Sequence, residues 1–441
     1  MAGESLTLPE FHQETTKTWP LFRRIGFRFC FVYFILYSLL NQIVNSIFLI
    51  PKVDVPDWAT LWPIRLGILW AGRHIFRIKS ELVYADSGSG DKAFDWVLVF
   101  CTLAISTVAA AVWSIADRKR GSYPALSRWF HVFLRFALAS QMLVYGFAKI
   151  VPLQMYFPFL FKFLEPLRNF SPMGVLWTST GLSPAYESFT GCAELTGGFL
   201  LISSRTTTLG ALVCLADMIQ VFTLNMTYDV CVKLLSFHLI LISLLVLGPD
   251  LPQLFSFLVR NQPAKLNPFE PLFRAPRANR IASFVLATLW CWMIAANLVD
   301  VWDGWRAVGS ARPKSALYGI WTVDQLAVDG QPQSLAATNT GQWRRISFDL
   351  PNWVHIQQMD DTLTGYAATL DAQKKTLSLT NANDRSWHAN FTYARPATEE
   401  LMLDGTVNGH KQHIELRLMD YTKFPVTSRG FHWIQDYPFN H

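Results

Sequence analysis

The sequence predicts an α-helical polytopic membrane bundle of about seven transmembrane helices, followed by an all-β, antiparallel, barrel-like soluble domain. Three observations predict this fold class. Of the 441 residues, 51% are hydrophobic and only 16% are charged, whereas soluble chains carry about 25% charged residues. The long apolar runs all lie before residue 312. From residue 312 onward the chain alternates polar and apolar residues over short segments, and it carries 12 Lys/Arg against 13 Asp/Glu.

A helix that crosses a bilayer needs about 20 mostly apolar residues. Seven segments meet this requirement, namely 27–50, 94–115, 130–151, 186–203, 206–224, 229–248 and 281–300. Residues 58–78 are also long enough, but Arg65, Arg73 and Arg77 share one helical stripe, with three tryptophans nearby. This pattern is typical of a helix that lies in the membrane interface. We therefore expect an interfacial helix there, with a spanning helix as the alternative.

These segments divide the chain into four parts. We expect an N-terminal membrane segment with two transmembrane helices and the interfacial helix at 1–127, and a four-helix transmembrane core at 128–260. A basic link and the last transmembrane helix follow at 261–311, and the β domain occupies 312–441. The aromatic stretch 153–170 contains Pro158 and Pro166, and we expect it to lie at the outer membrane surface.

Basic residues gather in alternate connections. They precede the first predicted span, separate the second from the third, follow the fourth and fill the link before the seventh: Arg23, Arg24, Arg28, Arg118, Lys119, Arg120, Arg128, Arg205, Arg260, Lys265, Arg274, Arg277 and Arg280. Such loops are normally cytoplasmic. We expect a multi-pass protein of the plasma (bacterial inner) membrane, with a cytoplasmic N-terminus and an extracytoplasmic, periplasmic C-terminal domain. The sequence has no basic patch rich enough to predict nucleic-acid binding.

Three stretches carry a further pattern, namely FALASQMLVYGFAKI (136–150), FTGCAELTGGFLLISSRTTTLGAL (189–212) and NMTYDVCVKLLSFHLILISLLVL (225–247). They contain a helix ending in G-x-x-K, a helix with E-x-x-G-G, and an Arg-Thr turn. In this respect residues 128–248 resemble the DoxX/DoxD family of four-helix membrane proteins. The resemblance implies a four-helix core. Members of that family are linked to quinone-coupled sulfur oxidation and to assembly of redox enzymes, so it also implies quinone as a cofactor.

Ionisable side chains within predicted spans are the candidate site residues. Such a group costs about 2.5–3.5 kcal/mol at the bilayer centre on insertion scales and therefore usually faces an interior or a cavity. We assign catalytic proton exchange to Glu194, Asp217, Lys233 and His238, and ligand contact to Gln141, Tyr145, Lys149, Gln220 and Asp229. Most of them fall in the outer half of the bundle. The alternative is a purely structural network, in which Lys149 pairs with Glu187 or Glu194 and Asp229 pairs with Lys233.

Two further expectations concern single residues in this set. His238 has no partner at ligand spacing on its helix, and we predict no metal site. Gly191, Gly197 and Gly198 would allow neighbouring helices to approach closely, as small residues do in membrane interfaces. We therefore expect helix 186–203 to lie at the bundle centre.

Residues 316–441 contain eight short alternating segments separated by turn dipeptides such as Asp-Gly and Asn-Gly, a pattern typical of an antiparallel meander. Gly319, Trp321 and the late Arg429 resemble the lipocalin pairing of a G-x-W motif with an arginine near the end of the barrel. The resemblance implies that Arg429 lies against Trp321. The domain contains no cysteine, and we expect it to fold without the membrane part.

Three functions are consistent with these features. The first is a protein that binds a small lipid-soluble molecule such as a quinone and supports a redox process, with or without catalysing it. The second is a non-catalytic accessory protein that binds lipid, or that serves assembly with a redox or other partner protein. The third is a carboxylase-like enzyme with a lysine base, which shares only the architecture of a helical membrane domain joined to an outer β domain. The sequence alone leaves open whether the protein is an enzyme.

Overall fold

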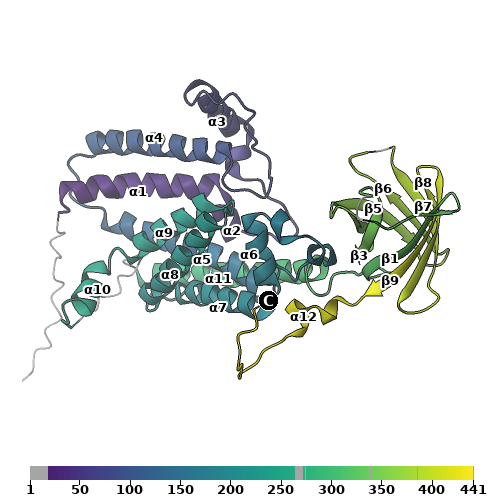
Figure 1. Cartoon of the computed structure of the whole chain (residues 1–441). Helices are drawn as coiled ribbons and strands as arrows, with labels where there is room; N and C mark the ends of the chain where they lie inside the picture. Colours follow the sequence, from purple (N-terminus) through teal and green to yellow (C-terminus); the bar gives the residue numbers. More distant parts are fainter. Residues whose placement is uncertain (1–17, 264–271, 274, 337–338, 385, 441) are drawn as a thin grey trace, which may run out of the picture. The chain divides into compact units, whose positions relative to one another are not determined.

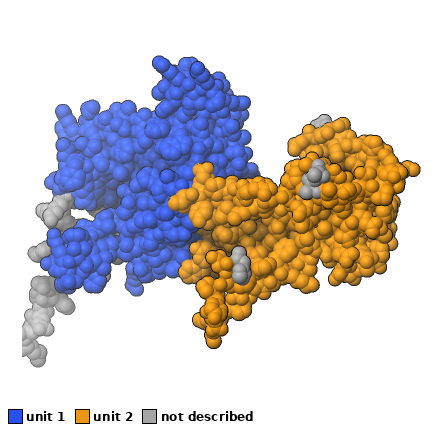
Figure 2. Space-filling model, in the orientation of Figure 1, with its two compact units in different colours: residues 1–144, 193–226, 231–297 blue, residues 145–192, 227–230, 298–441 orange. Residues whose placement is uncertain are grey.

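The computed structural model describes residues 18–263, 272–273, 275–336, 339–384 and 386–440. It contains a helical region with four helices that are long and apolar enough to cross a membrane, and a closed antiparallel β-barrel of eight strands near the C-terminus. The predicted fold class is therefore confirmed. The chain divides into two compact units (Figure 2), one of residues 1–144, 193–226 and 231–297, the other of residues 145–192, 227–230 and 298–441. Lys265 and Arg274, two of the basic residues named above, lie outside the described residues.

The helices follow the order of the predicted spans (Figure 1). They are α1 (Leu21–Leu40), α2 (Gln42–Ile47), α3 (Trp62–His74), α4 (Ala93–Ala116), α5 (Pro124–Ile150), α6 (Pro172–Gly181), α7 (Pro184–Leu200), α8 (Thr207–Thr227), α9 (Lys233–Leu247), α10 (Leu251–Leu258), α11 (Pro276–Ala307) and α12 (Pro425–Ser428). The four candidate spans are α4, α5, α8 and α11, and α9 with α10 forms a fifth if that pair, bent by 80°, counts as one span. α1 and α7 occupy the other two predicted spans, so a count of seven stays a prediction.

Two predicted helices have different bounds in the structure. The helix expected at 27–50 is broken because Asn41 is extended and its side chain accepts a hydrogen bond of 3.1 Å from the backbone N–H of Ile43, which caps α2. The helix expected at 229–248 begins only at Lys233, because Asp229 lies in a turn with φ of 52°. Asp229 and Lys233 therefore do not share a helix, and that prediction was wrong.

The helix within residues 58–78, α3, is too short to span a bilayer. α3 has 13 residues, which at 1.5 Å per residue gives about 20 Å, while the hydrocarbon core of a bilayer is about 30 Å thick. Ile68 and Ala71 on one face of α3 are buried in a cluster with Phe94 and Val97 of α4. α3 thus lies beside the N-terminal end of a candidate span.

The most buried of the four candidate spans is α5, with 72% of its most apolar stretch buried, against 28% for α4 and α8 and 22% for α11. We expected residues 186–203 to lie at the bundle centre. The helix in that position, α7, instead leaves Tyr186, Phe189 and Phe199 exposed along one side. The large exposed apolar surface of α4, α8 and α11 is what a lipid environment favours.

The glycines of α7 lie on its packed side. A Cβ added to Gly197 would be 2.7 Å from the sulfur of Cys214 on α8, and one added to Gly198 would be 3.1 Å from the Cβ of Met142 on α5. Both distances are closer than ordinary van der Waals contact. The predicted close packing of α7 through its glycines is therefore confirmed.

The β domain is a meander that closes on itself. Its strands are β1 (Gly319–Val328), β2 (Gln331–Pro332), β3 (Trp343–Leu350), β4 (Trp353–Gln358), β5 (Leu363–Asp371), β6 (Thr376–Thr380), β7 (His388–Ala394), β8 (Glu400–Val407) and β9 (His410–Met419). Each pairs antiparallel with its neighbour, and β1 also pairs with β9, from Ile320 opposite Met419 to Val328 opposite Gln412. Asn408 and Gly409 both have positive φ in the two-residue β8–β9 turn, as a type I′ hairpin requires.

The inward side chains of the barrel form one buried hydrophobic cluster that includes Trp321, Phe348 and Ile356. The Trp321 indole N–H donates to the carbonyl of Leu317 at 2.9 Å. Side chains of all eight barrel strands contribute to this cluster, so the barrel interior is packed. An eight-stranded barrel is just wide enough to be filled in this way.

The arginine beside Trp321 is not the one predicted. The guanidinium carbon of Arg395, which directly follows β7, lies 5.4 Å from the centre of the Trp321 ring. Arg429 instead lies over Phe439, at 4.1 Å. The glycine of the G-x-W motif is required by the backbone, because the φ of 147° at Gly319 favours glycine and an added Cβ would be 2.5 Å from Leu418.

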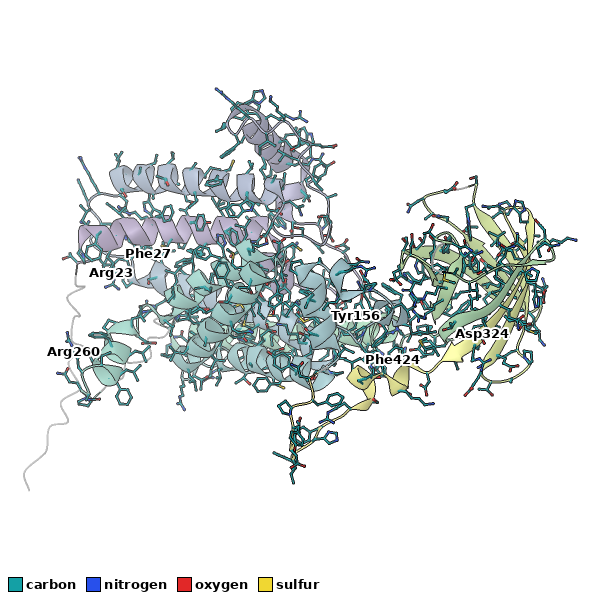
Figure 3. All side chains as sticks on the ribbon, in the orientation of Figure 1. Arg23, Phe27, Tyr156, Arg260, Asp324 and Phe424 are labelled. Carbon is teal, nitrogen blue, oxygen red and sulfur yellow. The ribbon has the colours of Figure 1, made fainter. Side chains whose placement is uncertain are left out.

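Residues 157–165, here called the arm, pack on the outside of the barrel. They lie within the stretch 153–170 that we expected at the membrane surface, and that expectation did not foresee their contacts with the barrel. Leu160 is fully buried with Ile320 of β1, and Phe424, labelled in Figure 3, has its ring 6.0 Å from that of Phe163. The arm therefore covers apolar barrel surface that would otherwise face water.

Polar contacts hold the arm in register. The backbone N–H of Leu160 donates to Asp349 of β3 at 2.7 Å, and Gln357 of β4 donates to the carbonyl of Leu164 at 2.9 Å. Asp349 also pairs with Arg312 at 3.2 Å, and both side chains are less than 10% exposed. Without the arm, Asp349 would lose one of its two hydrogen-bond donors.

We predict that residues 312–441 alone fold less stably than the same domain carrying residues 155–168 through a flexible linker. Covering Leu160 and Ile320 should raise the free energy of unfolding by about 2–5 kcal/mol, and Leu160→Ala in the fused form should remove most of that gain. Chemical denaturation followed by β-type circular dichroism measures the difference. Equal stability of all three proteins would show that the arm contributes nothing to the barrel.

We also predict that the arm makes the stability of the barrel depend on pH. Burial, with a smaller effect of the Lys162 charge, lowers the pKa of His355 from 6.5 to about 4, and the ring of Phe161 stacks on His355 with centroids 3.9 Å apart. Unfolded His355 takes up its proton near pH 6.5, whereas folded His355 does so only near pH 4. Stability is therefore present above pH 6.5 and falls as the pH drops towards 4.

The measurement is the unfolding free energy of the arm-fused domain between pH 7 and pH 4.5. His355→Gln should flatten the profile, and the domain without the arm should show a weaker dependence. A profile that is identical with and without His355 would contradict the prediction.

Candidate functional site

A buried hydrogen bond between a tyrosine and a histidine joins α1 to α9. The Nδ1 of His238 lies 2.6 Å from the carbonyl oxygen of Leu234, and its Nε2 lies 2.7 Å from the hydroxyl of Tyr33. Because a carbonyl can only accept, Nδ1 carries the proton and Nε2 accepts from the tyrosine O–H. Tyr33 and His238 are 4% and 3% exposed. The pair is thus a preformed proton donor and acceptor in an apolar surrounding.

Tyr37 completes this cluster. Its ring stacks on His238 with centroids 3.7 Å apart and planes inclined by 9°. The tyrosine hydroxyl hydrogen-bonds to the side chain of Asn41, which directly follows α1. We call Tyr33, Tyr37 and His238 the Tyr–His cluster. The imidazole is held at one ring face by Tyr37 and at both nitrogens by hydrogen bonds, which fixes its orientation.

Lys233, the predicted base, is engaged by an acid that the sequence reasoning missed. Asp91 lies 3.8 Å from the Lys233 ammonium, and its two carboxylate oxygens accept from the backbone N–H groups of Lys233 and Leu234 at 2.8 and 2.9 Å. Asp91 therefore caps the N-terminus of α9. The sequence reasoning did not predict this contact of Lys233 with Asp91, and the pairing of Lys233 with Asp229 stays a prediction.

Glu194 and Asp217 come together between α7 and α8. Both carboxylates interact electrostatically with the thiol of Cys214, the residue against which Gly197 packs. Glu194 is 1% exposed, and Asp217 is half-buried. These two predicted residues therefore share one location. That location has no residue in common with the Tyr–His cluster.

Lys149 and Tyr145 lie near the C-terminal end of α5. Lys149 is 6% exposed and interacts electrostatically with Glu187 of α7, whose carboxylate accepts from the backbone N–H of Met155 at 2.8 Å. A Cβ on Gly191 would lie 2.9 Å from the Cβ of Lys149. Lys149 therefore lies near Glu187, one of the two acids with which the structural alternative pairs it.

The remaining predicted ligand contacts are dispersed. Gln141 is fully buried and accepts from Gln42 at 2.8 Å, while Gln220 is exposed and Asp229 lies in the turn before α9. Among the described residues no group of three His, Cys, Asp or Glu side chains is placed to hold a metal ion.

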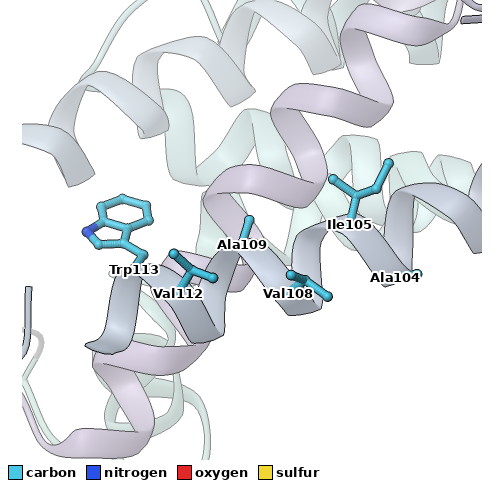
Figure 4. Close-up of a pocket in the computed structure, with 6 residues that line it drawn as sticks. All are labelled: Ala104, Ile105, Val108, Ala109, Val112 and Trp113. Carbon is cyan, nitrogen blue, oxygen red and sulfur yellow. The ribbon is translucent and has the colours of Figure 1, made fainter. Parts of the chain in front are cut away.

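An apolar groove runs along one face of α4 (Figure 4). It is lined by Ala104, Ile105, Val108, Ala109, Val112 and Trp113. Ligand sites usually combine an apolar lining with a few polar groups that orient the ligand, and here only the indole N–H of Trp113 is polar. We assign this face to contact with lipid chains.

Two of the residues that build these sites were not predicted, Tyr33 and Asp91. Tyr33 precedes Tyr37 and Asn41 at four-residue intervals, a helical stripe of polar side chains that could have identified it. Asp91 gave no such signal, because it stands just before the apolar run of α4 and resembles a cap of its own helix rather than of α9.

A protein with a helical region of candidate membrane spans and a packed β-barrel is thus the class that the fold defines. Over 131 residues the chain is 32% identical to the "Uncharacterized protein YwoB" of Bacillus subtilis strain 168, an alignment that covers 30% of this chain and 79% of that protein. The chain belongs to the same family as YwoB. No family model and no solved structure matches the chain.

We predict that Asp91→Ala destabilises the helical region by about 1–2 kcal/mol, because two N–H groups of α9 lose their acceptor. Asp91→Asn should cost less, since asparagine is an equally good cap. Thermal unfolding in detergent measures the effect, with Asp86→Ala in the same loop as the matched control. If Asp91→Ala and Asp86→Ala unfold at the same temperature, the cap contributes nothing measurable.

Proposed function

We propose that the protein binds a lipid-soluble small molecule such as a quinone at the Tyr–His cluster and exchanges protons with it, in support of a redox process. The observation that carries the proposal is the 2.7 Å hydrogen bond between Tyr33 and His238, buried between α1 and α9. The resemblance of residues 128–248 to the DoxX/DoxD family agrees with this proposal but does not carry it.

The donor set fits such a ligand. Tyr33 uses its proton toward His238, and its oxygen keeps a lone pair that can accept a second hydrogen bond. If a quinol is bound there, the Tyr33 oxygen would accept a hydroxyl proton from it and pass its own proton to Nε2 of His238, which would become an imidazolium. Tyr37 stacks on the imidazole at 3.7 Å, and a ring face stabilises such a cation.

The same residues explain the direction of proton flow. Nδ1 of His238 is held by Leu234 at 2.6 Å, so Nε2 is the nitrogen left to receive the proton. Asn41, which bonds the Tyr37 hydroxyl, extends the polar residues of α1 toward the α2 end. We place the proton's exit on that side.

We further propose the orientation that the basic loops predict. The backbone N–H of Trp19 donates to Gly121, and Arg24 donates to Arg120, at 2.9 and 3.1 Å. The arginines at the start of α1 thus lie with the basic loop between α4 and α5. Under the positive-inside rule this end is cytoplasmic, and the plasma membrane is the compartment we propose.

The carboxylase-like alternative gains no support, because Lys233 is held by Asp91 through its ammonium and its backbone. The assembly alternative is distinguished by what co-purifies with the protein. A stoichiometric protein partner in the absence of any extractable small molecule would favour assembly.

We predict that native mass spectrometry and organic extraction of the purified protein recover a quinone. Tyr33→Phe preserves the ring but removes the hydroxyl, and it should lower the quinone content per folded protein roughly fivefold, the effect of about 1 kcal/mol of lost hydrogen bonding. His238→Gln should do the same. Tyr186→Phe, at an exposed tyrosine of α7, is the matched control.

Glu194→Gln distinguishes a ligand site at the Tyr–His cluster from a ligand site at the carboxylate pair of α7 and α8. If the ligand lies at the Tyr–His cluster, this variant should keep its quinone. Retention of quinone by Tyr33→Phe and His238→Gln, with loss in Glu194→Gln, would move the site to the second location. Absence of quinone from the unaltered protein would overturn the proposal.

A further inference from the structure

α3 has a tryptophan-rich face that is exposed on the described chain. Trp62, Leu66 and Trp70 recur at four-residue intervals, so they share one side of the helix, and they are 69%, 48% and 57% exposed. The opposite side packs on α4 through Ile68 and Ala71. A large exposed apolar patch on a protein surface marks a contact with something else.

The position of α3 along α4 indicates at which end of the candidate span this face lies. Phe94 and Val97, which α3 contacts, stand in the first turns of the candidate span α4. The far end of α4 is the one fixed to α1 by Arg28, which donates to Ser114 at 2.8 Å and to the carbonyl of Asp117 at 3.0 Å. α3 therefore lies at the end of the α1–α4 pair opposite to the basic loop (Figure 1), where a span leaves the membrane.

The charge of the segment is complementary to lipid headgroups. Between residues 61 and 80 the chain has four basic residues and no acidic one. Arg73, Arg77 and Lys79 are exposed. On a helical wheel Arg73 falls beside Trp62 and Trp70, whereas Arg77 follows the end of the helix with a φ of 53°. Basic residues are normally kept off the outer side of a membrane, so their presence at this end needs a reason of its own.

We infer that α3 is an interfacial anchor that binds the outer surface of the bilayer and prefers anionic lipid. Trp62, Leu66 and Trp70 enter the boundary between headgroups and acyl chains, where tryptophan is enriched. Arg73 binds headgroup phosphates from the same face, and Arg77 binds them from the exposed segment that follows the helix. The occupant of this surface is lipid, and not a second copy of the chain or another protein.

A spin label on the full-length protein in nanodiscs tests the inference. A nitroxide introduced through a non-natural amino acid at position 66 avoids the six native cysteines. It should collide with oxygen, which dissolves in lipid, and be shielded from a water-soluble nickel complex. A label at position 86, in the exposed loop before α4, should show the reverse.

The preference for anionic lipid is tested by adding phosphatidylglycerol to phosphatidylcholine nanodiscs. The label at position 66 should become better shielded from nickel, and the double change Arg73→Gln, Arg77→Gln should abolish that response. Lys374→Gln with Lys375→Gln, which removes equal charge from an exposed turn of the barrel, should leave it intact. Trp62→Ser with Trp70→Ser should raise nickel access in both lipids.

Three results would overturn the inference. Nickel access at position 66 equal to that at position 86 would place the face in water. An immobilised label shielded from both reagents would mean that protein covers the face. A response to phosphatidylglycerol that persists without Arg73 and Arg77 would show that these arginines do not recognise the headgroups.

Discussion

Buried polar groups in the helical region have to find their partners within the protein, because a hydrocarbon surrounding offers none. Arg28 shows what this constraint does. Its guanidinium bonds Tyr123, Ser114 and the carbonyl of Asp117, and so ties the start of α1 to the end of α4. Arg135 likewise donates to the carbonyls of Leu201 and Ile202, at the C-terminal end of α7, where a helix has carbonyls to satisfy. The polar residues thus determine which helix ends meet, while the glycines determine how closely the helices approach.

The arm shows the same constraint in the soluble part of the chain. Asp349 sits on the outer face of a barrel strand and yet is 3% exposed, which requires both Arg312 and the N–H of Leu160 beside it. The alternating pattern of the strands predicted a domain that folds on its own, because the inward residues of the strands suffice to fill the interior of the barrel. The pattern did not explain Asp349, Ser347 and Gln357, three polar residues buried on strands. A covering segment from elsewhere in the chain was the missing explanation.

Structural features that a repeating pattern within one element indicates were predicted well. The α4 span, the β meander and the glycine packing of α7 each depend on periodicity or on local chemistry. Pairings between distant elements were not predictable in this way. Arg395 and Arg429 are both arginines late in the barrel sequence, and only the closed register of β7 beside β8 decides that Arg395 reaches Trp321. The role of Asp91 was equally unpredictable. Its local sequence is typical of a residue that caps α4, whereas in the structure it caps α9.

The loop that carries Asp91 also links the two proposals physically. It begins at the end of α3 and ends at α4, and within it Gly90 donates to the carbonyl of Cys231 at 2.8 Å. Asp91 caps α9 at Lys233, and Lys233 precedes His238 by only five residues along the chain. The imidazole is anchored to the first turn of that helix through Leu234. The N–H of Leu234 in turn donates to Asp91. If both proposals hold, the position of α3 at the membrane surface is connected, through one carboxylate and one backbone unit, to Nδ1 of the imidazole whose Nε2 receives the proton from Tyr33.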